Sequence, residues 1–453
     1  MTMNLLRELW TSLGGRSDNA RHVEVVGLES LRSVFRVTEL ASASVGAAAL
    51  SIAELIATRH GTHPGIRVDR RLSSLWFGTS LRPDGWTVPS PWDSIAGDYR
   101  SADGWIKLHT NAPPHRQAAL AVLNVAADKA AIADAVAGWA ADRLEAAIVD
   151  RGGCAAAMRG PAEWAVHPQG LAVGSEPLFH LVTTAATSAP QWAVPRASPL
   201  AGIRVLDLTR VLAGPVATRF LAGYGADVLR IDPPWWEEPG VVPEVTLGKR
   251  CARLNITDAA QRRQFEDLLS KADVLVHGYR PGALAHLGFD AEKRRAIRPG
   301  LIDVSLDAYG WTGPWAGRRG FDSLVQMSSG IAEAGMRGME RDRPTPLPVQ
   351  ALDHAAGYLV AAAAIRGVTT RLSTGQGLEA RTSLARVAAV LIKQPADPEA
   401  APIPAEEPGD LAETIEATEW GPARRLLPPV SVEGASMIWT RPAAALGSSD
   451  PAW

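Results

Sequence analysis

Short apolar runs alternate with helix-period segments through the second half of the chain. Four runs, GIRVLDL, ADVLRID, ADVLVHG and GLIDVSLD, are rich in Val, Ile and Leu, and each gives way to a turn or to a segment with helical spacing. Such short runs are typical of strands buried on both faces, and their alternation with helices is typical of a parallel sheet. The pattern therefore predicts an α/β fold, with a doubly wound parallel sheet in a large domain over residues 199–393.

The N-terminal part of the chain carries a different pattern. Residues 41–59 form an Ala-rich stretch that predicts a helix, and residues 118–150 also have helical spacing. Between them, YRSADGWIKLH predicts a hairpin that turns at its Asp-Gly pair. We therefore expect a helical segment over residues 1–74 and a smaller α+β domain over residues 75–190.

Two further segments follow the predicted large domain. Residues 394–425 are rich in Pro, Ala and Glu and poor in large apolar side chains, which is typical of an exposed linker. Residues 426–453 form a tail that is irregular and partly strand-like. We expect neither segment to form a domain of its own.

The chain also contains a faint internal repeat. Residues 37–75 resemble residues 349–387, since both have a helix of small residues, a Gly turn and an amphipathic stretch that carries Arg. Ala richness alone is the other explanation of this similarity. If the repeat is real, Asp353 corresponds to Ala41 or Ser42, and only the second copy carries a carboxylate at that place.

Composition narrows the range of functions. The 453 residues include 46 basic and 48 acidic side chains, so the net charge is -2 and no global field favours nucleic acid or an anionic membrane. The apolar runs at 41–50 and 359–365 are too short to span a bilayer and predict buried helices. Two cysteines form no disulfide framework, which fits a reducing cytoplasm, and no cluster of His, Cys, Asp or Glu has metal-ligand spacing.

Five ordered segments carry a resemblance to a known family. They are PLAGIRVLDLTRVLAGPVATRFLAGYGADVLRIDPP, LGKRCARLNI, ADVLVHGYRPGALAHLGFD, GLIDVSLDAYGWTGPWAGRRGFDSLVQMSSG and LPVQALDHAAGYLVAAAAI. In this order, over residues 199–387, they resemble the motifs of the family III CoA-transferases. The resemblance implies an enzyme that moves CoA from an acyl-CoA thioester to a carboxylic acid. It also implies a homodimer, with CoA as substrate and no permanently bound cofactor.

Asp353 is the candidate nucleophile, because the resemblance places the family's catalytic aspartate there. A carboxylate can attack a thioester carbonyl to form a mixed anhydride, and released CoA thiolate then gives an aspartyl-CoA thioester. From spacing alone, Asp353 would instead cap the Ala-rich helix that follows, since Asp is a strong N-cap. The next residue, His354, is either a general base or a half-exposed histidine at a helix start.

The resemblance also implies a set of CoA contacts. The turn TRVLAGP follows the first strand of the sheet, where ligands of doubly wound sheets bind, and its small residues admit a close approach to the backbone. Basic side chains further along the chain suit the CoA phosphates, and an aromatic ring suits the adenine. The candidate CoA-binding residues are Arg210, Leu212, Ala213, Lys249, Arg250, Gly278, Tyr279, Arg280 and His286.

The sequence departs from the family in ways that keep other readings open. His277 and Gly278 replace the usual Glu-Asn pair, and Thr246 or Leu247 stands where an Asn is usual. The small-domain-like material precedes the large domain, and the linker stands where a small domain normally follows. These departures favour a non-catalytic acyl-CoA-binding scaffold, or an internal pseudo-dimer in place of the homodimer. An α-methylacyl-CoA racemase is a further alternative, but it needs a basic His where this chain has Phe321.

Overall fold

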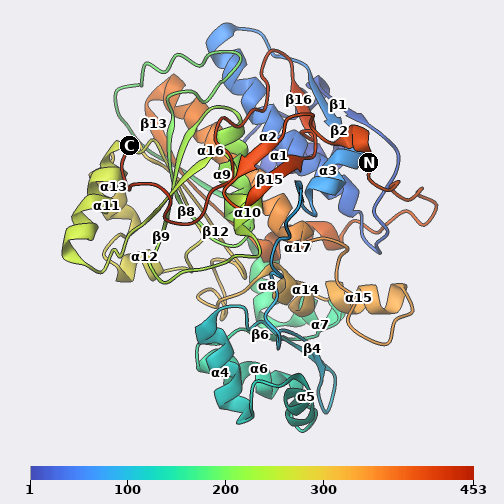
Figure 1. Ribbon diagram of the computed structural model, residues 1–453. Coiled ribbons are helices and arrows are strands. Elements are labelled where there is room, and N and C mark those ends of the chain that lie inside the picture. Colours follow the sequence, from blue (N-terminus) through green and yellow to red (C-terminus); the bar gives the residue numbers. More distant parts are fainter. Residues whose placement is uncertain (1) are drawn as a thin grey trace.

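A seven-stranded sheet forms the centre of the larger part of the molecule in the computed structural model, which describes residues 2–453 (Figure 1). Six strands are parallel, in the order β10-β9-β8-β11-β12-β13, and β7 adds an antiparallel edge. Numbered along the chain, the parallel strands lie in the order 3-2-1-4-5-6, so the predicted doubly wound α/β sheet is confirmed. The bounds are β7 (His180–Ala186), β8 (Arg204–Leu208), β9 (Asp227–Asp232), β10 (Lys249–Arg253), β11 (Val274–His277), β12 (Ile302–Asp307) and β13 (Gln376–Ser383).

Helices cover both faces of this sheet, which explains why its strands read as continuous apolar runs. Successive strand residues point to opposite faces, so Val205 packs with the core around α9 and α16, and Leu206 packs with the core around α11. The helices of this part are α9 (Ala213–Gly223), α10 (Val242–Val245), α11 (Ala259–Lys271), α12 (Ala283–His286), α13 (Ala291–Ile297), α16 (Ala351–Thr374) and α17 (Leu384–Ile392).

A smaller unit lies at the bottom of Figure 1, in teal. Its sheet is antiparallel, and the predicted hairpin is present, with the Ser101 N–H donating to the Gly104 carbonyl at 3.0 Å. The helical stretch predicted over 118–150 is three helices, because Asn124 ends the first in a left-handed conformation and Asp128 caps the second. The elements are β4 (Gly97–Arg100), β5 (Trp105–Leu108), β6 (Ala155–Ala157), α4 (Pro113–Leu123), α5 (Lys129–Ala137) and α6 (Ala141–Asp150).

Four short helices lie between the two parts, and the C-terminal segment packs back on the chain. The four are α7 (Pro161–Val166), α8 (Pro168–Ser175), α14 (Asp322–Ser328) and α15 (Ile331–Gly338). The segment predicted as a linker contains η2 (Pro408–Asp410), β14 (Glu416–Thr418) and β15 (Gly421–Arg425). Strand β15 pairs antiparallel with β3 (Leu81–Pro83), so this segment is anchored and is not a free linker.

The internal repeat is present in the structure as two helices of 24 residues each, α2 (Val37–His60) and α16. Both begin after a residue with the same backbone angles: φ -76° and ψ 65° at Arg36, and φ -76° and ψ 66° at Gln350. Both end at a left-handed glycine, Gly61 and Gly375. The two helices pack against each other in the core of the larger part (Figure 1).

The caps set the register of the repeat, and they correct the sequence alignment. With Arg36 opposite Gln350, the residue that matches Asp353 is Glu39, because each is the third residue of its helix. The expectation that Ala41 or Ser42 matches Asp353, and that only the second copy carries a carboxylate, is therefore wrong. Two Ala-rich sequences can be aligned two positions apart with almost the same number of matching residues. The positions at which the two helices begin and end allow no such shift.

The strands beside the two helices repeat as well. Strand β1 (Val23–Val26) is parallel to β2 (Ile66–Asp69), and β16 (Val430–Val432) is antiparallel to β2. This arrangement matches β12, β13 and β7 in the large sheet. The edge strands come from outside the copies that they complete. Strand β7 joins the large sheet but precedes the large domain in sequence, whereas β16 joins the sheet of the first copy but follows the large domain. The first copy therefore has a three-stranded sheet and lacks the rest of the doubly wound sheet.

Helix α2 is long and apolar enough to cross a membrane by composition, but 89% of its most apolar window is buried inside the protein. It packs against α1 (Thr2–Ser12), α3 (Arg70–Trp76) and α16, next to η1 (Ser17–His22). The expected buried helix is confirmed, although it extends well beyond the apolar run that predicted it.

Candidate active site

A cavity of about 370 Å³ opens beyond the carboxyl ends of β8 and β11, where the strand order of the sheet reverses. This is the crevice in which doubly wound sheets bind ligands. Seven of the side chains and turns singled out in the sequence line it together: Arg210, Leu212, Ala213, Gly278, Tyr279, Arg280 and Asp353. Residues from three segments far apart in the chain thus meet at one cavity.

Asp353 lies in the first turn of α16, and only 7% of its surface is exposed. Its backbone N–H donates to the Oδ2 atom of Asp322 at 2.9 Å, and among residues 2–453 its own carboxylate accepts no hydrogen bond. The helix begins after Gln350, which makes no side-chain cap. Within the described chain, the carboxylate of Asp353 therefore caps no helix, and it lines the cavity.

A close contact between two helices brings Asp353 to the loop that follows β8. At Gly357, one turn beyond Asp353, an added Cβ would lie 2.5 Å from the Ala213 carbonyl oxygen and 2.8 Å from Cβ of Val216. Only glycine allows α16 to approach the start of α9 this closely. The approach places the aspartate beside the predicted CoA-binding turn.

Burial raises the pKa of Asp353 well above its ordinary value, and the nearby Asp322 carboxylate raises it further. Burial also raises the pKa of Asp322 to about 6, although hydrogen bonds from the backbone of Asp353, from Gln326 and from the backbone of Leu352 oppose the rise. Two buried carboxyl groups this close together share a proton readily, because both cannot ionise without cost. At least one of the two carboxyl groups therefore stays protonated to a higher pH than an ordinary aspartate does.

The loop after β8 is held in a strained conformation. Val211 has φ of +63°, which is rare for a β-branched residue. Its N–H donates to the Oε2 atom of Glu238 at 2.9 Å, and Glu238 also pairs with Arg230. Strain of this kind persists where surrounding contacts fix the backbone, and it is common at ligand sites.

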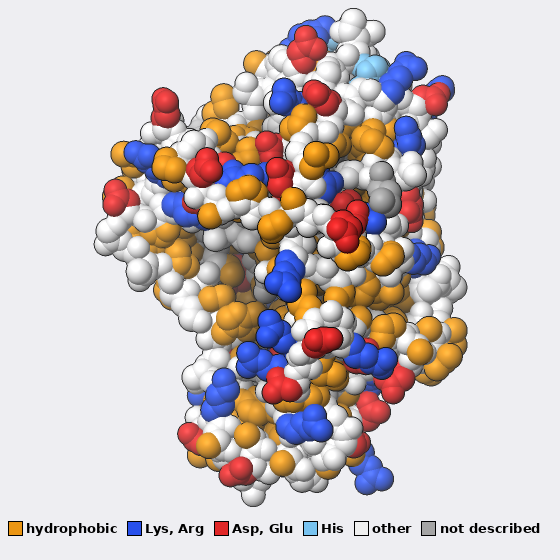
Figure 2. Space-filling model, turned by 90° about the vertical axis from the view of Figure 1, so that its right-hand side faces the viewer, with side chains coloured by type: hydrophobic (Ala, Val, Ile, Leu, Met, Phe, Trp, Pro, Cys, Tyr) orange, Lys and Arg blue, Asp and Glu red, His pale blue; other side chains and the backbone are white. Residues whose placement is uncertain are grey.

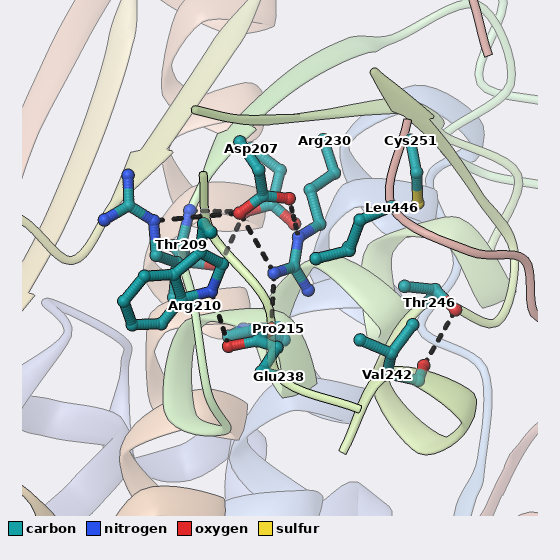
Figure 3. A network of polar contacts seen from close by, with 12 residues as sticks. Asp207, Thr209, Arg210, Pro215, Arg230, Glu238, Val242, Thr246, Cys251 and Leu446 are labelled. Carbon is teal, nitrogen blue, oxygen red and sulfur yellow. Dashed lines mark hydrogen bonds and ion pairs between the residues drawn. The ribbon is translucent and has the colours of Figure 1, made fainter. Parts of the chain in front are cut away.

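The base of the same loop rests on a buried carboxylate (Figure 3). Asp207 accepts hydrogen bonds from the Thr209 N–H at 2.9 Å and from the Thr218 hydroxyl at 2.5 Å, and it pairs with Lys249 at 3.1 Å. Burial raises the pKa of Asp207, but Lys249 and Arg230 outweigh burial and hold that pKa below its ordinary value. Asp207 is therefore an anion that shapes the loop from below.

Arg210 extends from this loop across the cavity. Its guanidinium lies 4.9 Å from the ring centre of Trp236 and 5.2 Å from that of Tyr279, and it donates to the Tyr279 hydroxyl at 2.9 Å. The three side chains form a cationic and aromatic surface. Arg280 follows Tyr279, lines the cavity and is exposed.

Three predicted CoA contacts lie outside the cavity lining. Lys249 is buried against Asp207, and its Nζ atom also donates to the Pro215 carbonyl at 3.0 Å. Arg250 pairs with Asp227 at 2.7 Å on the far strand of the sheet. His286 is exposed and bonds to the Gly282 carbonyl at 2.6 Å. Lys249 reaches the cavity only indirectly, by supporting the loop through Asp207.

His354 is buried, so the prediction of a half-exposed histidine at the helix start is wrong. Its ring is fully buried and stacks on Phe77 with ring centres 5.1 Å apart. Burial lowers the pKa of His354 to about 3, so the imidazole is neutral. It is not among the residues that line the cavity.

The cavity also includes residues that sequence reasoning missed. His115 comes from α4 of the small unit, and its ring lies edge-on to Phe321 with centres 6.0 Å apart. Phe321 stacks flat on His109 at 3.7 Å. Nothing in the sequence links α4 to the cavity, because tertiary packing alone brings it there. Arg319 also lines the cavity, and it directly precedes the GFD motif at residues 320–322.

Comparisons with known proteins find a family match and relatives for part of the chain. The family model of CoA-transferase family III matches residues 200–413. Succinyl-CoA:glutarate CoA-transferase of Mus musculus is 35% identical over 205 residues, which cover 42% of this chain and 47% of that protein. Acetyl-CoA:oxalate CoA-transferase of Acetobacter aceti is 34% identical over 41% of this chain and 51% of that protein. The chain spans about half the length of the curated relatives it matches.

A solved structure is also similar to part of the chain. The crystal structure of Rv3272 from Mycobacterium tuberculosis is 32% identical, covers 44% of this chain and 57% of that one, and superposes with a TM-score of 0.40.

Among residues 2–453, no group of three or more His, Cys, Asp or Glu side chains could hold a metal ion.

Proposed function

We propose, from the premise that residues 200–413 belong to CoA-transferase family III, that this protein moves CoA from an acyl-CoA thioester to a carboxylic acid. One observation carries the proposal: the Asp353 carboxylate, which accepts no hydrogen bond among residues 2–453, lines the same cavity as Arg210, Tyr279 and Arg280. A nucleophile and a surface suited to a phosphorylated nucleotide thus share one cavity at the switch point of the sheet.

In the proposed reaction, a carboxylate oxygen of Asp353 attacks the thioester carbonyl carbon. The C–O bond forms, the C–S bond breaks, and CoA leaves as the thiolate with the electron pair. The thiolate then attacks the aspartyl carbonyl of the anhydride, which releases the donor carboxylate and leaves an aspartyl-CoA thioester. The acceptor carboxylate repeats the two steps in reverse, so Asp353 is regenerated and no net proton is consumed.

The cavity residues divide this work. Arg210 and Arg280 suit the phosphate groups of CoA, and the ring of Tyr279 suits the adenine. The strained turn at Val211 and the small residue Ala213 allow the pantetheine arm to pass close to the backbone. Asp322 holds the start of α16 and so orients Asp353.

Direct measurement of transfer tests the proposal. The purified chain is incubated with an acyl-CoA and an isotope-labelled carboxylic acid, and labelled acyl-CoA is followed by chromatography. We expect label in the thioester, together with exchange of the labelled donor carboxylate into acyl-CoA through the aspartyl thioester when no acceptor is present. Binding of acyl-CoA without either exchange would favour the second candidate, a non-catalytic acyl-CoA-binding scaffold, which the replaced family Asn residues support.

A racemase has less support in this cavity. That chemistry needs a base on each side of the α-carbon, and Phe321 in the GFD motif cannot accept a proton. A racemase would exchange the proton at the α-carbon, and a transferase would not. Loss of deuterium from an acyl-CoA labelled at that carbon therefore distinguishes the two activities.

The state of assembly and the cellular location are also proposals. The homodimer stays a prediction from the family resemblance, and the α2–α16 pair favours the alternative of an internal pseudo-dimer. Both cysteines are free and buried, which fits the proposed cytoplasmic location.

A further inference from the structure

Four aspartates in the strands of the large sheet are buried, and one of them has no cation beside it. The other three form ion pairs: Asp207 with Lys249 at 3.1 Å, Asp232 with Arg230 at 2.7 Å and Asp303 with Arg294 at 2.6 Å. The fourth, Asp307, ends β12, and among residues 2–453 no Lys, Arg or His nitrogen lies within ion-pair distance of it. A buried carboxylate without a cation is costly, so this carboxyl group favours its neutral form.

Asp307 lines the same cavity as Asp353, and one of its two oxygens is available there. The Oδ1 atom accepts the Gly310 N–H at 2.9 Å, and this bond closes the turn after β12. Within the described chain no group bonds to Oδ2, and Oδ2 is not among the buried polar atoms that lack a partner. It is therefore accessible, and it is the polar atom that Asp307 offers to a ligand in the cavity.

A second carboxylate, that of Glu176, holds the same turn. Its Oε1 atom accepts the N–H groups of Trp311 and Thr312 at 2.9 and 2.7 Å. Burial is the main cause that raises the pKa of Asp307 to about 8; the Gly310 N–H opposes the rise and the Glu176 charge adds to it. At neutral pH Asp307 therefore carries a proton, and the proton lies on Oδ2, because Oδ1 accepts the Gly310 N–H.

The other ionisable groups around this carboxyl group do not take its proton. His115 is a weaker base, because burial, followed by the charge of Arg319, lowers its pKa to about 4. His180 of β7 lies 3.7 Å from the Glu176 carboxylate, whose charge also acts on Arg386 of α17. The charged side chains that share the cavity lining with Asp307 are Arg210, Arg280, Arg318, Arg319 and Asp353.

We propose that Asp307 is a catalytic hydrogen-bond donor, whose Oδ2–H binds the thioester carbonyl oxygen and stabilises the oxyanion formed when Asp353 attacks. The inference rests on the proposed function, because it gives a second carboxyl group a role in the same reaction. A carboxylic acid that an apolar site keeps neutral can act in this way. Figure 2 shows Lys and Arg side chains around the narrowing between the larger and smaller parts of the molecule, whereas Asp307 supplies a neutral donor inside the cavity.

The step balances without a net proton transfer. As the Asp353 oxygen bonds to the carbonyl carbon, the π electron pair moves to the carbonyl oxygen, which then shares the Asp307 proton. When the C–S bond breaks and the thiolate leaves, the carbonyl forms again and the proton stays on Asp307.

Profiles of kcat/KM against pH test the inference, because a purely structural role in the turn would not change the position of a limb. The variants are Asp307→Asn, Asp307→Ala and Glu176→Gln. Asp342→Ala is the matched control, since Asp342 is an exposed aspartate outside the cavity lining. Asp307→Asn keeps an acceptor for the Gly310 N–H and supplies an N–H donor that does not titrate. Thermal unfolding checks that each variant is folded.

In the wild type and in Asp342→Ala, kcat/KM should fall as the pH rises through about 8, because ionised Asp307 donates no hydrogen bond and repels the oxyanion. Asp307→Asn should keep part of the rate at neutral pH and lose this alkaline limb, and Asp307→Ala should lose about 100-fold or more. Glu176→Gln should move the limb to lower pH, since loss of the Glu176 charge lowers the pKa of Asp307. An alkaline limb that is unchanged in Asp307→Asn would overturn the inference.

Infrared spectra of bound acetyl-CoA, labelled with carbon-13 at the carbonyl carbon, give a readout that needs no transfer. They are recorded in Asp353→Asn, where the thioester does not react, with and without Asp307→Ala. The carbonyl band should lie at lower wavenumber when Asp307 is present, because the hydrogen bond weakens the C=O bond. If this band shift is present but the wild type transfers no CoA, the inference stands and the proposed function fails. Transfer without a band shift overturns the inference and leaves the proposed function in place.

Discussion

Glu39 and Asp353 occupy the same place in two copies of one structural unit. Each is the third residue of a 24-residue helix, and the helices begin with the same backbone angles and end at left-handed glycines. Their surroundings differ. Glu39 is paired with Arg70 at 3.1 Å and with Arg36 at 3.6 Å, whereas the Asp353 carboxylate faces a cavity. The repeat therefore retains the carboxylate in both copies, but it pairs Glu39 with arginines and places Asp353 in the cavity lining.

The first prediction is one reactive carboxylate per chain. Within residues 2–453 the first copy lacks the doubly wound sheet and its switch point, so we expect no CoA site beside Glu39. Hydroxylamine added during incubation with acyl-CoA should trap one adduct per chain, and mass spectrometry should place it on the peptide that contains Asp353. Glu39→Gln should keep the transfer rate within about twofold and lower stability by about 1–3 kcal/mol, since Arg70 loses its counter-charge. An adduct on Glu39 would contradict this assignment.

The second prediction concerns Asp353→Asn. An amide cannot form the anhydride, so transfer should fall by at least about three orders of magnitude, the scale of losing a nucleophile. Stability should stay the same or rise at neutral pH, because the raised pKa of Asp353 means that burial disfavours its charged form. Acyl-CoA binding, measured by calorimetry, should persist. Full activity in this variant would remove Asp353 from the mechanism.

The sequence predicted the sheet and the core of the site because both depend on local pattern. Four of the large-domain strands were visible as apolar runs, and the turn after β8 was identified from its small residues. The partners of the site could not be found in this way. His115 reaches the cavity through packing of the small unit, and burial of Lys249 follows from its pairing with Asp207. Neither relationship leaves a trace in spacing.

The register of the repeat shows another limit of sequence reasoning. The sequence alignment predicted a match between Asp353 and Ala41 or Ser42, because small residues recur throughout both helices. The backbone conformation at the helix ends decides for Glu39. Cap geometry depends on how the preceding segment enters the helix, and an Ala-rich sequence does not encode it clearly.

The third prediction concerns the state of assembly. Two homologous helices, α2 and α16, already pack against each other within one chain, and strands β7 and β16 cross between the two halves. We therefore expect light scattering at micromolar concentration to give the mass of one chain, 48.1 kDa. Twice this mass would restore the homodimer implied by the family resemblance and would contradict the internal pseudo-dimer.

The fourth prediction uses two glycines of α16. An added Cβ at Gly357 would lie 2.5 Å from the Ala213 carbonyl oxygen, and one at Gly367 would lie 2.5 Å from the Cγ2 atom of Ile302. Both Gly→Ala changes should cost about 1–3 kcal/mol through overpacking. Only Gly357→Ala displaces Asp353 from the turn at Ala213, so it alone should lower transfer, by about 10-fold or more, at a temperature where both variants are folded. Equal activity in the two variants would contradict the positioning role of this contact.

The last prediction concerns the pH dependence set by Asp322. The proposed reaction requires Asp353 as a carboxylate, and burial together with Asp322 raises the pKa of Asp353. In the wild type, kcat/KM should therefore rise with pH through the range above the ordinary Asp value, as the pair loses its shared proton. Asp322→Asn removes the neighbouring negative charge, while the amide oxygen can still accept the Asp353 N–H. The pKa of Asp353 should then fall, and the acidic limb of the profile should move to lower pH.

A structural role alone would not produce this shift. If Asp322 served only to hold the start of α16, Asp322→Asn would lower the rate equally at every pH and leave the limb in place. The control is Arg341→Ala, because Arg341 is exposed and lies outside the cavity lining. Its pH profile should match that of the wild type. Ionisation of the substrate phosphates affects all three proteins equally and cannot cause a difference between them. Profiles of kcat/KM between about pH 4 and 9 decide the matter, because that parameter reports ionisations of the free enzyme and free substrate. An acidic limb that stays fixed in Asp322→Asn would exclude electrostatic coupling between the two carboxyl groups as a determinant of the rate.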